Sequence, residues 1–283
     1  MQESSFGDSQ VFSPVGEPAG DEASLTVDQA IANLRGPDLG LRYYAAWWLG
    51  RFRIATPESV DALIEGLSDE SDRTAEGGYP LRRNAARALG KLGDLRAVQP
   101  LLQCLDCDDF YVREAAVQSL GMLGDRSCVP VLLSLLEGGV EASQAGSKGV
   151  QLAQPYNAIL EALGALGAPE AVSLIEPFLN HPVEMLQYAA ARAMYELTQD
   201  SSYAERLVQA LSGDKLPLRR AALADLGAIG YLPAADAIAQ TLAENSLKLI
   251  ALKGLLEKQV LQTSAPSLSE GAIQVMVLMD ELL

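Results

Sequence analysis

The stretch of sequence that decides the fold lies at residues 41–50 and reads LRYYAAWWLG. It recurs at residues 81–90 as LRRNAARALG, and further clear copies begin at Val112 and Leu218. Weaker copies begin at Pro155, Leu186 and Leu247. Successive copies therefore start 40, 31, 43, 31, 32 and 29 residues apart. These spacings lie in or near the range expected for a repeat made of two helices.

Each copy predicts one helix that packs through small side chains. With the first residue of a copy counted as offset zero, apolar residues recur at offsets 0, 4, 5 and 8, which form one stripe of an α-helix. Alanine at offsets 4 and 5 allows a neighbouring helix to approach closely. Glycine follows at offset 9 and often again at offset 12, where a helix can end in the left-handed conformation. The glycines at offset 12 are Gly93, Gly124, Gly167 and Gly230.

A second apolar helix follows each of these stops. It begins with a polar residue or a proline, as in TPESV at residues 56–60, and proline costs little in the first turn of a helix. No segment alternates polar and apolar residues with a period of two, so no strand is predicted. The sequence therefore predicts an all-α, right-handed α-solenoid of about six to seven HEAT-like repeats.

Three regions of the chain differ in composition. Residues 1–24 contain Ser, Gly, Pro and acidic residues without one basic residue, which predicts a disordered tail. Residues 25–260 form the solenoid and begin with a capping helix at residues 25–34. Residues 261–283 form a linker and a C-terminal helix, whose apolar residues either cap the last repeat or dock a partner. Two connections, at residues 68–80 and 138–155, exceed the basic period.

The charge of the chain limits its partners. Lys and Arg number 21 and Asp and Glu number 37 among 283 residues, so the formal net charge is −16. Such a charge argues against nucleic acid and against an anionic membrane surface as partners. The chain contains no apolar run of about 20 residues and starts without a signal-peptide pattern. Together with only three cysteines, these features predict a soluble cytoplasmic protein.

The sequence lacks the common catalytic motifs and any evident metal site. There is no phosphate-binding loop, no dinucleotide-binding fingerprint and no nucleophile elbow. The single histidine, His181, precedes a proline at a turn between helices, so we expect it to be a solvated turn residue. Cys104 and Cys107 form a C-x-x-C near the end of a helix, where the helix dipole does not favour a thiolate, so a structural role is expected for both.

The arginine at offset 1 recurs with the repeat, so we expect a structural role in which it bridges to an acidic residue of the next repeat. These arginines are Arg42, Arg82, Arg113 and Arg219. Other basic and aromatic residues lie at offsets 2, 3, 6 and 10, which point away from the apolar stripe. If the small-residue helices line the inner curve, the groove gains Tyr43, Trp47, Arg51, Arg83, Arg87, Tyr188 and Arg192.

A basic and aromatic groove in an acidic protein is suited to a flat, conjugated anion. Arginine binds carboxylates through two hydrogen bonds, and aromatic faces stack on a conjugated ring system. The alternative is that the adjacent Trp47 and Trp48 plug the end of the solenoid. Since they are neighbours on one helix, we expect one to face the core and the other the groove.

The run YYAAWWLGRFR at residues 43–53, followed by LRRNAARALG, resembles the E subunits of phycobilin lyases, which are HEAT-like proteins of cyanobacteria. The resemblance extends over residues 25–260. The length, the acidity and the insertion before residues 154–157 resemble those members of the family that act with phycocyanobilin.

This resemblance implies a heterodimer with a second HEAT-like subunit, F, that attaches phycocyanobilin to a cysteine of the apo-phycocyanin alpha subunit through a thioether bond. It implies phycocyanobilin as a substrate and no resident cofactor or metal, because the acceptor's own thiol adds to the ethylidene group of the bilin. On this hypothesis the arginines bind the bilin propionates, namely Arg51, Arg53, Arg83 and Arg87. The aromatic residues Tyr43, Tyr44 and Trp47 stack on the bilin, and an acid such as Asp109 contacts its pyrrole N–H groups.

Two alternatives stay open. One is the E subunit of the lyase-isomerase that makes phycoviolobilin on phycoerythrocyanin. The isomerase motif of that pair, of the His-Cys-Gln-Gly-Asn type, belongs to its F subunit, so its absence here does not separate the two. The other is a HEAT-repeat adaptor that binds proteins without a chromophore, since fold alone does not imply function.

Overall fold

The computed structural model of the chain describes residues 25–145, 154–262 and 268–283. The α-helices in chain order are α1 (Val27–Arg35), α2 (Leu39–Arg51), α3 (Pro57–Gly66), α4 (Pro80–Leu92), α5 (Val98–Gln103), α6 (Phe110–Leu123), α7 (Val129–Ser134), α8 (Gly139–Ala145), α9 (Tyr156–Ala165), α10 (Val172–Ile175), α11 (Glu184–Thr198), α12 (Ser201–Ala210), α13 (Leu216–Ile229), α14 (Ala235–Gln240), α15 (Asn245–Gln262) and α16 (Glu270–Leu282). Short 3-10 helices are η1 (Leu95–Ala97), η2 (Cys104–Asp106), η3 (Arg126–Cys128), η4 (Pro169–Ala171), η5 (Glu176–Asn180) and η6 (Leu232–Ala234). The predicted tail at residues 1–24 and most of the linker after Gln262 lie outside these ranges.

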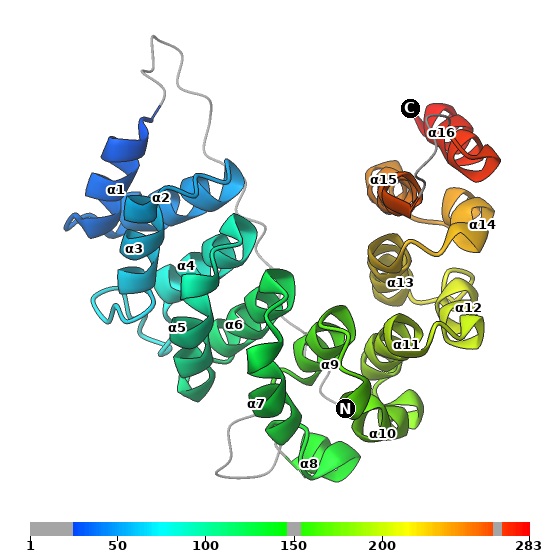
Figure 1. The fold of residues 1–283 in the computed structure, drawn as a ribbon, viewed down its shortest axis with the longest axis horizontal. Coiled ribbons are helices and arrows are strands. Elements are labelled where there is room, and N and C mark those ends of the chain that lie inside the picture. The colour runs from blue at the N-terminus through cyan, green and yellow to red at the C-terminus, as the bar shows by residue number, and fades with distance from the viewer. Residues whose placement is uncertain (1–24, 146–153, 263–267) are drawn as a thin grey trace, which may run out of the picture.

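The helices form two rows that curve into an open crescent (Figure 1). The inner row consists of the small-residue helices α2, α4, α6, α9, α11, α13 and α15, each of which packs against the next. The outer row includes α1, α3, α5, α7, α10, α12, α14 and α16. The described residues contain no strand, and the predicted all-α solenoid is confirmed. The structure also places the small-residue helices on the inner curve, which the sequence analysis left open.

The glycines at offsets 9 and 12 have different structural roles. Gly93 ends α4 with φ of 77°, and Gly124, Gly167 and Gly230 adopt similar left-handed angles, as the sequence predicts. The glycine at offset 9 instead lies inside the helix, where a side chain would collide with the next inner helix. A Cβ atom on Gly50 would lie 2.8 Å from Ala88 Cα, and one on Gly121 would lie 3.1 Å from Ala162 Cα. In these two pairs offset 9 of one repeat meets offset 7 of the next. Near the other end of the same helices Asn84, at offset 3, donates to Tyr43 O, at offset 2, so α2 and α4 run side by side in the same direction.

The arginines at offset 1 are structural, but they bind more carbonyl groups than acids. Arg42 pairs with Asp69 at 2.7 Å and also donates to Leu34 O, while Arg82 pairs with Glu70 at 3.2 Å. Arg113 is almost fully buried and donates to Cys107 O and Asp108 O. Arg219 donates to Leu242 O and Gly213 O. Arg42 and Arg82 thus pair with acids as expected, but Asp69 and Glu70 lie in the connection between the two copies and not in the next repeat. Arg113 and Arg219 instead donate to carbonyl groups of loops.

The C-terminal helix caps the solenoid with one face and exposes the other. α16 packs against α14 and α15, and its Ala272 and Val275 are buried. Ile273, Met276 and Val277 remain about half exposed. Capping is therefore one role of this helix.

The prediction for His181 is wrong. Its side chain is 2% exposed, and its ring stacks on Phe178 with centroids 5.8 Å apart. Its Nε2 lies 2.8 Å from Ser143 Oγ, and Nδ1 accepts the Val183 N–H. Ser143 belongs to α8, within the long insertion, so the turn is covered by a helix that the repeat pattern does not contain.

The cysteines are consistent with the expected structural role. Cys104 and Cys128 are buried, and all three thiols are free. Burial raises the pKa of Cys104 to about 12 and that of Cys128 to about 11, which disfavours a thiolate at either position. No helix in the described part of the chain is long and apolar enough to cross a bilayer.

Candidate functional site

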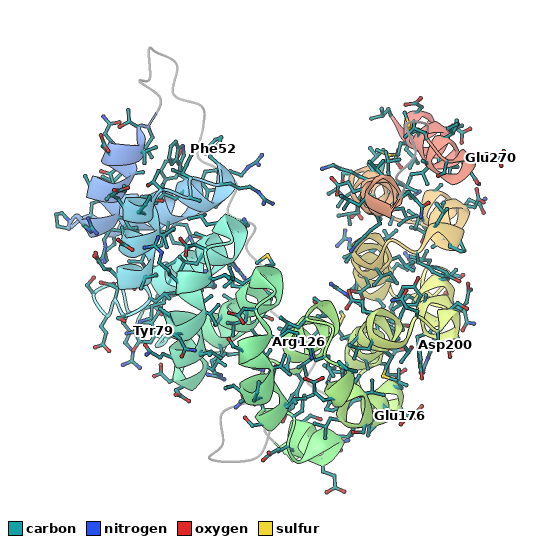
Figure 2. All side chains as sticks on the ribbon, in the orientation of Figure 1. Phe52, Tyr79, Arg126, Glu176, Asp200 and Glu270 are labelled. Atoms are coloured by element: carbon teal, nitrogen blue, oxygen red, sulfur yellow. The ribbon has the colours of Figure 1, made fainter. Side chains whose placement is uncertain are left out.

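The concave face of the crescent carries the residues that the sequence singled out. In the N-terminal arm, Tyr44 and Trp47 project from α2 with ring centroids 5.5 Å apart, and both are nearly half exposed. Trp48 turns to the other side, where it packs against the core and lies 5.2 Å from the ring of Phe52, on the N-terminal arm in Figure 2. The expected division between a core tryptophan and a groove tryptophan is therefore confirmed, and Tyr43 adds a third exposed ring beside this aromatic pair.

Basic groups flank the aromatic pair. Arg51 and Arg53 at the end of α2 and Arg87 on α4 are exposed, and none of them forms an ion pair with an acidic residue in the described part of the chain. Arg83 is half buried, and its guanidinium lies 5.8 Å from the centroid of the Tyr111 ring. These arginines are thus available to an anionic ligand, as the hypothesis requires.

Asp109 has a structural function in this fold. It caps α6, where its Oδ1 accepts the Tyr111 N–H at 2.8 Å, and its Oδ2 accepts the Tyr79 N–H at 2.8 Å. It also lines a hollow of about 520 Å³ together with Arg83 and Tyr111. The role of Asp109 toward pyrrole N–H groups stays a prediction, but its two oxygens already hold the backbone.

The structure does not gather all the predicted residues into one pocket. Arg83 lies in the first turn of α4 and Asp109 just before α6, whereas Arg51 lies in the last turn of α2. Because Gly50 lies level with Ala88, Arg51 lies level with Leu89, six residues from Arg83, or about 9 Å along the helix axes. The predicted residues therefore form a band across the N-terminal arm, while Tyr188 and Arg192 belong to the other arm.

Arg192 is the centre of a charged cluster that the sequence analysis missed. Its guanidinium lies 3.2 Å from Asp225 Oδ1, 3.4 Å from Glu161 Oε2 and 3.5 Å from Glu196 Oε1. The four side chains come from three consecutive inner helices, α9, α11 and α13. Asn157 donates a further hydrogen bond of 2.5 Å to Glu161. Arg192 is therefore not a free cation for a ligand carboxylate.

The cluster holds more negative than positive charge in a poorly solvated place. Burial raises the pKa of Glu161 to about 7, with Arg192 opposing the shift and Asp225 reinforcing it. Burial also raises the pKa of Glu196 and that of Asp225, in each case against the attraction of Arg192. Three carboxylates around one guanidinium do not all ionise easily, so burial and their mutual repulsion favour the protonated form of a carboxyl in the cluster.

A signal for this cluster was present in the repeat. Glu161 stands at offset 6 of its copy, the position that Trp47, Arg87 and Arg192 occupy in theirs. Glu196 stands at offset 10, as Arg51 does. A count of acidic as well as basic residues at these offsets identifies both glutamates as residues of the concave face.

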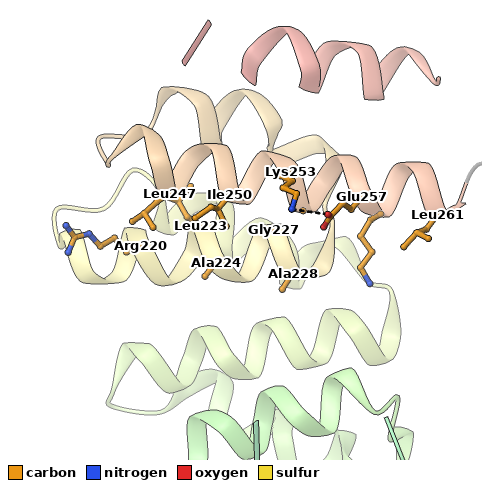
Figure 3. Close-up of a pocket in the computed structure, with 13 residues that line it drawn as sticks. Arg220, Leu223, Ala224, Gly227, Ala228, Leu247, Ile250, Lys253, Glu257 and Leu261 are labelled. Atoms are coloured by element: carbon orange, nitrogen blue, oxygen red, sulfur yellow. Dashed lines mark ion pairs between the residues drawn. The ribbon is translucent and has the colours of Figure 1, made fainter. Parts of the chain in front are cut away.

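Hollows adjoin the cluster and continue along the C-terminal arm. One of about 330 Å³ is lined by α6, α9 and α11 and includes Glu161 and Arg192. The next, of about 670 Å³, shares Arg192 and adds Glu196 and Lys258. A third, of about 400 Å³, shares Lys258 and lies between α13 and α15 (Figure 3). It has an apolar floor with Arg220 toward one end and the ion pair of Lys253 and Glu257, 3.3 Å apart, at its side.

Neighbouring hollows thus share lining residues, and together they make a track along the inner helices from α6 to α15. Within the described residues, no group of His, Cys, Asp and Glu side chains is arranged to hold a metal ion.

Family models match about half of the chain. The model of HEAT repeats matches residues 27–120 and 74–142, and the model of the PBS lyase HEAT-like repeat matches residues 156–181. Among solved structures, a chain of the complex of CpcE and CpcF of phycocyanin lyase from Nostoc sp. PCC7120 superposes with a TM-score of 0.83. It is 60% identical, and the match covers 96% of this chain and 100% of that one.

Relatives match over nearly the same length. The phycocyanobilin lyase subunit alpha of Microchaete diplosiphon is 64% identical over 268 residues, which is 93% of this chain and 91% of the relative. The subunit of the same name from Nostoc sp. is 61% identical over 94% of this chain and 97% of the relative. The bilin biosynthesis protein PecE of Nostoc sp. is more distant, at 45% identity over 83% of this chain and 88% of the relative. The chain therefore belongs to the family of phycocyanobilin lyase alpha subunits.

Proposed function

We propose that this chain is one subunit of a heterodimeric bilin lyase, which attaches phycocyanobilin to a cysteine of the phycocyanin alpha subunit through a thioether bond. Its partner is a second HEAT-like subunit of the F type, and the pair works in the cytoplasm. The observation that carries this proposal is the similarity to a chain of the CpcE and CpcF complex, which spans 96% of this chain and therefore every inner helix.

The reaction does not require a nucleophile from this chain. The acceptor protein supplies the thiol, which adds to the ethylidene group of the bilin, so the enzyme's contribution is to bring the two reactants together in the right orientation. The concave face supports this role, because it offers stacking surfaces at Tyr44 and Trp47 and unpaired guanidinium groups at Arg51 and Arg87. The bilin is a substrate in this scheme, and no cofactor is required.

The proposal is tested by reconstitution in a host that makes phycocyanobilin, the apo-phycocyanin alpha subunit and an F-type partner, with and without this chain. Covalently bound bilin is read from the absorbance of the acceptor after denaturation in acidic urea. We expect covalent phycocyanobilin only when this chain is present. A parallel run uses the phycoerythrocyanin alpha subunit and its own F partner. A blue-shifted phycoviolobilin spectrum there would favour the lyase-isomerase instead, and no dependence on this chain in either run would favour the adaptor.

The role of the N-terminal arm is tested in the same host with Trp47→Ala and Arg83→Ala. Both are expected to reduce bilin transfer by about tenfold without unfolding the protein, since a lost contact of about 1.4 kcal/mol is a factor of ten. Arg96→Ala is the matched control, because Arg96 is an exposed arginine of the outer row that pairs with Asp61 and Asp94. Normal transfer by both Trp47→Ala and Arg83→Ala would exclude this arm as the bilin site.

A further inference from the structure

The cluster around Arg192 is the largest group of buried charges in the described part of the chain that the proposed function has not used. Its side chains are partly open to solvent, with 24% of Glu161, 16% of Arg192 and 9% of Asp225 exposed. A ligand lying on the concave face can therefore reach Glu161, whereas Asp225 lies deeper and supports Arg192 from behind.

The hydrogen bonds of the cluster are incomplete. Glu196 Oε2, Arg192 Nε and Asn157 Oδ1 are buried atoms that have no hydrogen-bond partner among the described residues. Arg192 Nε lies 3.5 Å from Glu196 Oε1, and Glu196 Oε2 packs against Gly164, so these atoms belong to the interior of the cluster. Glu161 is the carboxylate that lines the smaller hollow and that a ligand reaches. Three carboxylates surround one guanidinium, so the cluster favours a ligand group that donates hydrogen bonds, such as an N–H, over an anionic group.

The hollows on either side suit an extended ligand. The smaller hollow contributes Ala158, Ala162 and Ala165, which leave room for a flat ring system. In the other direction the track reaches Lys258, which forms no ion pair with the described acidic residues and is therefore available to a carboxylate. The track therefore suits a ligand that places N–H groups at Glu161 and a carboxylate at Lys258.

We propose that the tetrapyrrole lies over this cluster, with its ring nitrogens facing Glu161 and a propionate at Lys258, and that Glu161 exchanges a proton with the tetrapyrrole during attachment. This inference rests on the proposed lyase function. It places the tetrapyrrole rings on the C-terminal arm during attachment, rather than on the aromatic band of the N-terminal arm, and makes Glu161 instead of Asp109 the acid that faces the ring nitrogens. The charged groups facing Glu161 are Arg192 and Glu196 from α11 and Asp225 from α13. From α6 only Gln118, Gly121 and Met122 line the same hollow, and none of them titrates.

The proton balance of the reaction closes without a further reagent. The O–H bond of the Glu161 carboxyl breaks, and an N–H bond forms at an imine nitrogen of the bilin, which makes the ethylidene carbon a better electrophile. The acceptor S–H bond then breaks and an S–C bond forms, while the ethylidene π pair moves through the conjugated system to neutralise the protonated nitrogen. The thiol's proton goes to the Glu161 carboxylate. The proton on the nitrogen moves to the ring carbon that formed the ethylidene double bond. The sum is one S–H bond and one C=C π bond replaced by one S–C and one C–H bond.

The test uses the purified heterodimer with its F-type partner, phycocyanobilin and apo-phycocyanin alpha subunit. The rate of covalent attachment is measured between about pH 5 and pH 9 for the wild type and for Glu161→Gln, which keeps the shape and the hydrogen bond to Asn157. We expect the wild-type rate to fall above about pH 7 as the carboxyl ionises, and the variant to lose about tenfold or more in rate together with this pH dependence. Glu65→Gln is the control, because Glu65 is an exposed outer glutamate paired with Arg35 at 2.8 Å.

A second readout does not depend on catalysis. The absorbance of phycocyanobilin bound to the heterodimer, without acceptor, reports protonation of the ring nitrogens as a red shift. We expect this shift at neutral pH in the wild type and its loss in Glu161→Gln, with bilin still bound. An unchanged pH profile and an unchanged bound spectrum in Glu161→Gln would overturn the inference while leaving the lyase function intact. A wild-type heterodimer that neither binds nor transfers bilin would overturn the proposed function itself.

Should Glu161→Gln fail to fold, Glu161→Asp replaces it. This variant keeps a carboxyl group but shortens the side chain by one methylene. We therefore expect the attachment rate to be lower and the pH at which it falls to change. A wild-type attachment rate that falls at the same pH as in the wild type would again exclude Glu161 as the proton-exchanging group.

Discussion

At the scale of single residues, the glycine at offset 9 sets how closely two repeats approach. Gly50 faces Ala88 with no room for a side chain, while Gly66, another buried glycine at a helix end, would place a Cβ atom 3.5 Å from Ala85 Cβ in ordinary contact. Both glycines are buried in a helix, but only Gly50 lacks room for a Cβ atom. Comparing alanine substitutions at the two positions therefore separates the effect of packing from the effect of helix propensity.

We expect Gly50→Ala to destabilise the protein by about 1–2 kcal/mol, because overpacking costs about 1–3 kcal/mol and the gain in helix propensity returns up to about 1 kcal/mol. Gly66→Ala is expected to be neutral or slightly stabilising. Urea denaturation followed by circular dichroism measures both. Equal effects from the two substitutions would contradict a close approach at Gly50.

Glu161 also gives the folded protein a pH dependence of its own. Its pKa is raised by burial from 4.5 to about 7, so the folded state binds a proton that the unfolded state has released in this range. The corresponding stability is complete below about pH 4.5 and is lost as the pH rises through about 7. The loss amounts to at most about 3 kcal/mol, since the neighbouring carboxylates share the proton.

We therefore expect the wild type to lose unfolding free energy relative to Glu161→Gln as the pH rises from about 4.5 to about 7. Chemical denaturation at several pH values measures this difference and cancels the contributions of other groups. A difference that does not vary with pH would mean that Glu161 is ionised throughout the range.

At the scale of elements, α16 has one buried face and one exposed face. Val275 is fully buried against the preceding helices, whereas Ile273 is 51% exposed on the same helix. Ser269 caps the helix through the Ala272 N–H at 3.1 Å, so the helix begins at a defined position.

We expect Val275→Asp to destabilise the protein by about 3 kcal/mol or more, because a charge replaces a packed side chain. Ile273→Asp is expected to leave stability within about 0.5 kcal/mol of the wild type. Thermal unfolding of the two variants measures the contrast. If Ile273→Asp proved equally harmful, the exposed face would also belong to the cap.

At the scale of the whole molecule, the crescent is a one-dimensional array. Each inner helix packs on its neighbours in the row, and the two arms lie apart across the opening (Figure 1). In such arrays a local loss of packing is felt mainly by adjacent repeats. The proposed bilin site and the N-terminal aromatic band therefore lie in parts that open independently.

Leu49 is a fully buried residue of α2 whose truncation tests this independence. We expect Leu49→Ala to cost about 2–5 kcal/mol locally and to lower the amide exchange protection of α1 to α4. Protection of α13 and α15 is expected to stay at the wild-type level in hydrogen-exchange mass spectrometry. A uniform loss along the chain would indicate a single cooperative unit.

The repeat copies by themselves determined the architecture of this protein. Apolar residues at fixed offsets place a stripe on each helix, and a stop at Gly93 or Gly124 ends it, so the order of the helices follows from local physics. The position of the small-residue row on the inner curve was decided by the packing between repeats. The opposite orientations of Trp47 and Trp48 follow in the same way, because neighbours on a helix point in different directions.

The charged cluster and the His181 environment were decided only by the tertiary structure. Glu161, Arg192 and Asp225 are more than thirty residues apart in sequence, and their pairing depends on the register in which three inner helices lie side by side. His181 is buried because α8, an insertion outside the repeat, folds back over it. A periodic pattern specifies which way each side chain points, but only packing between repeats decides which charges meet and how much water they lose.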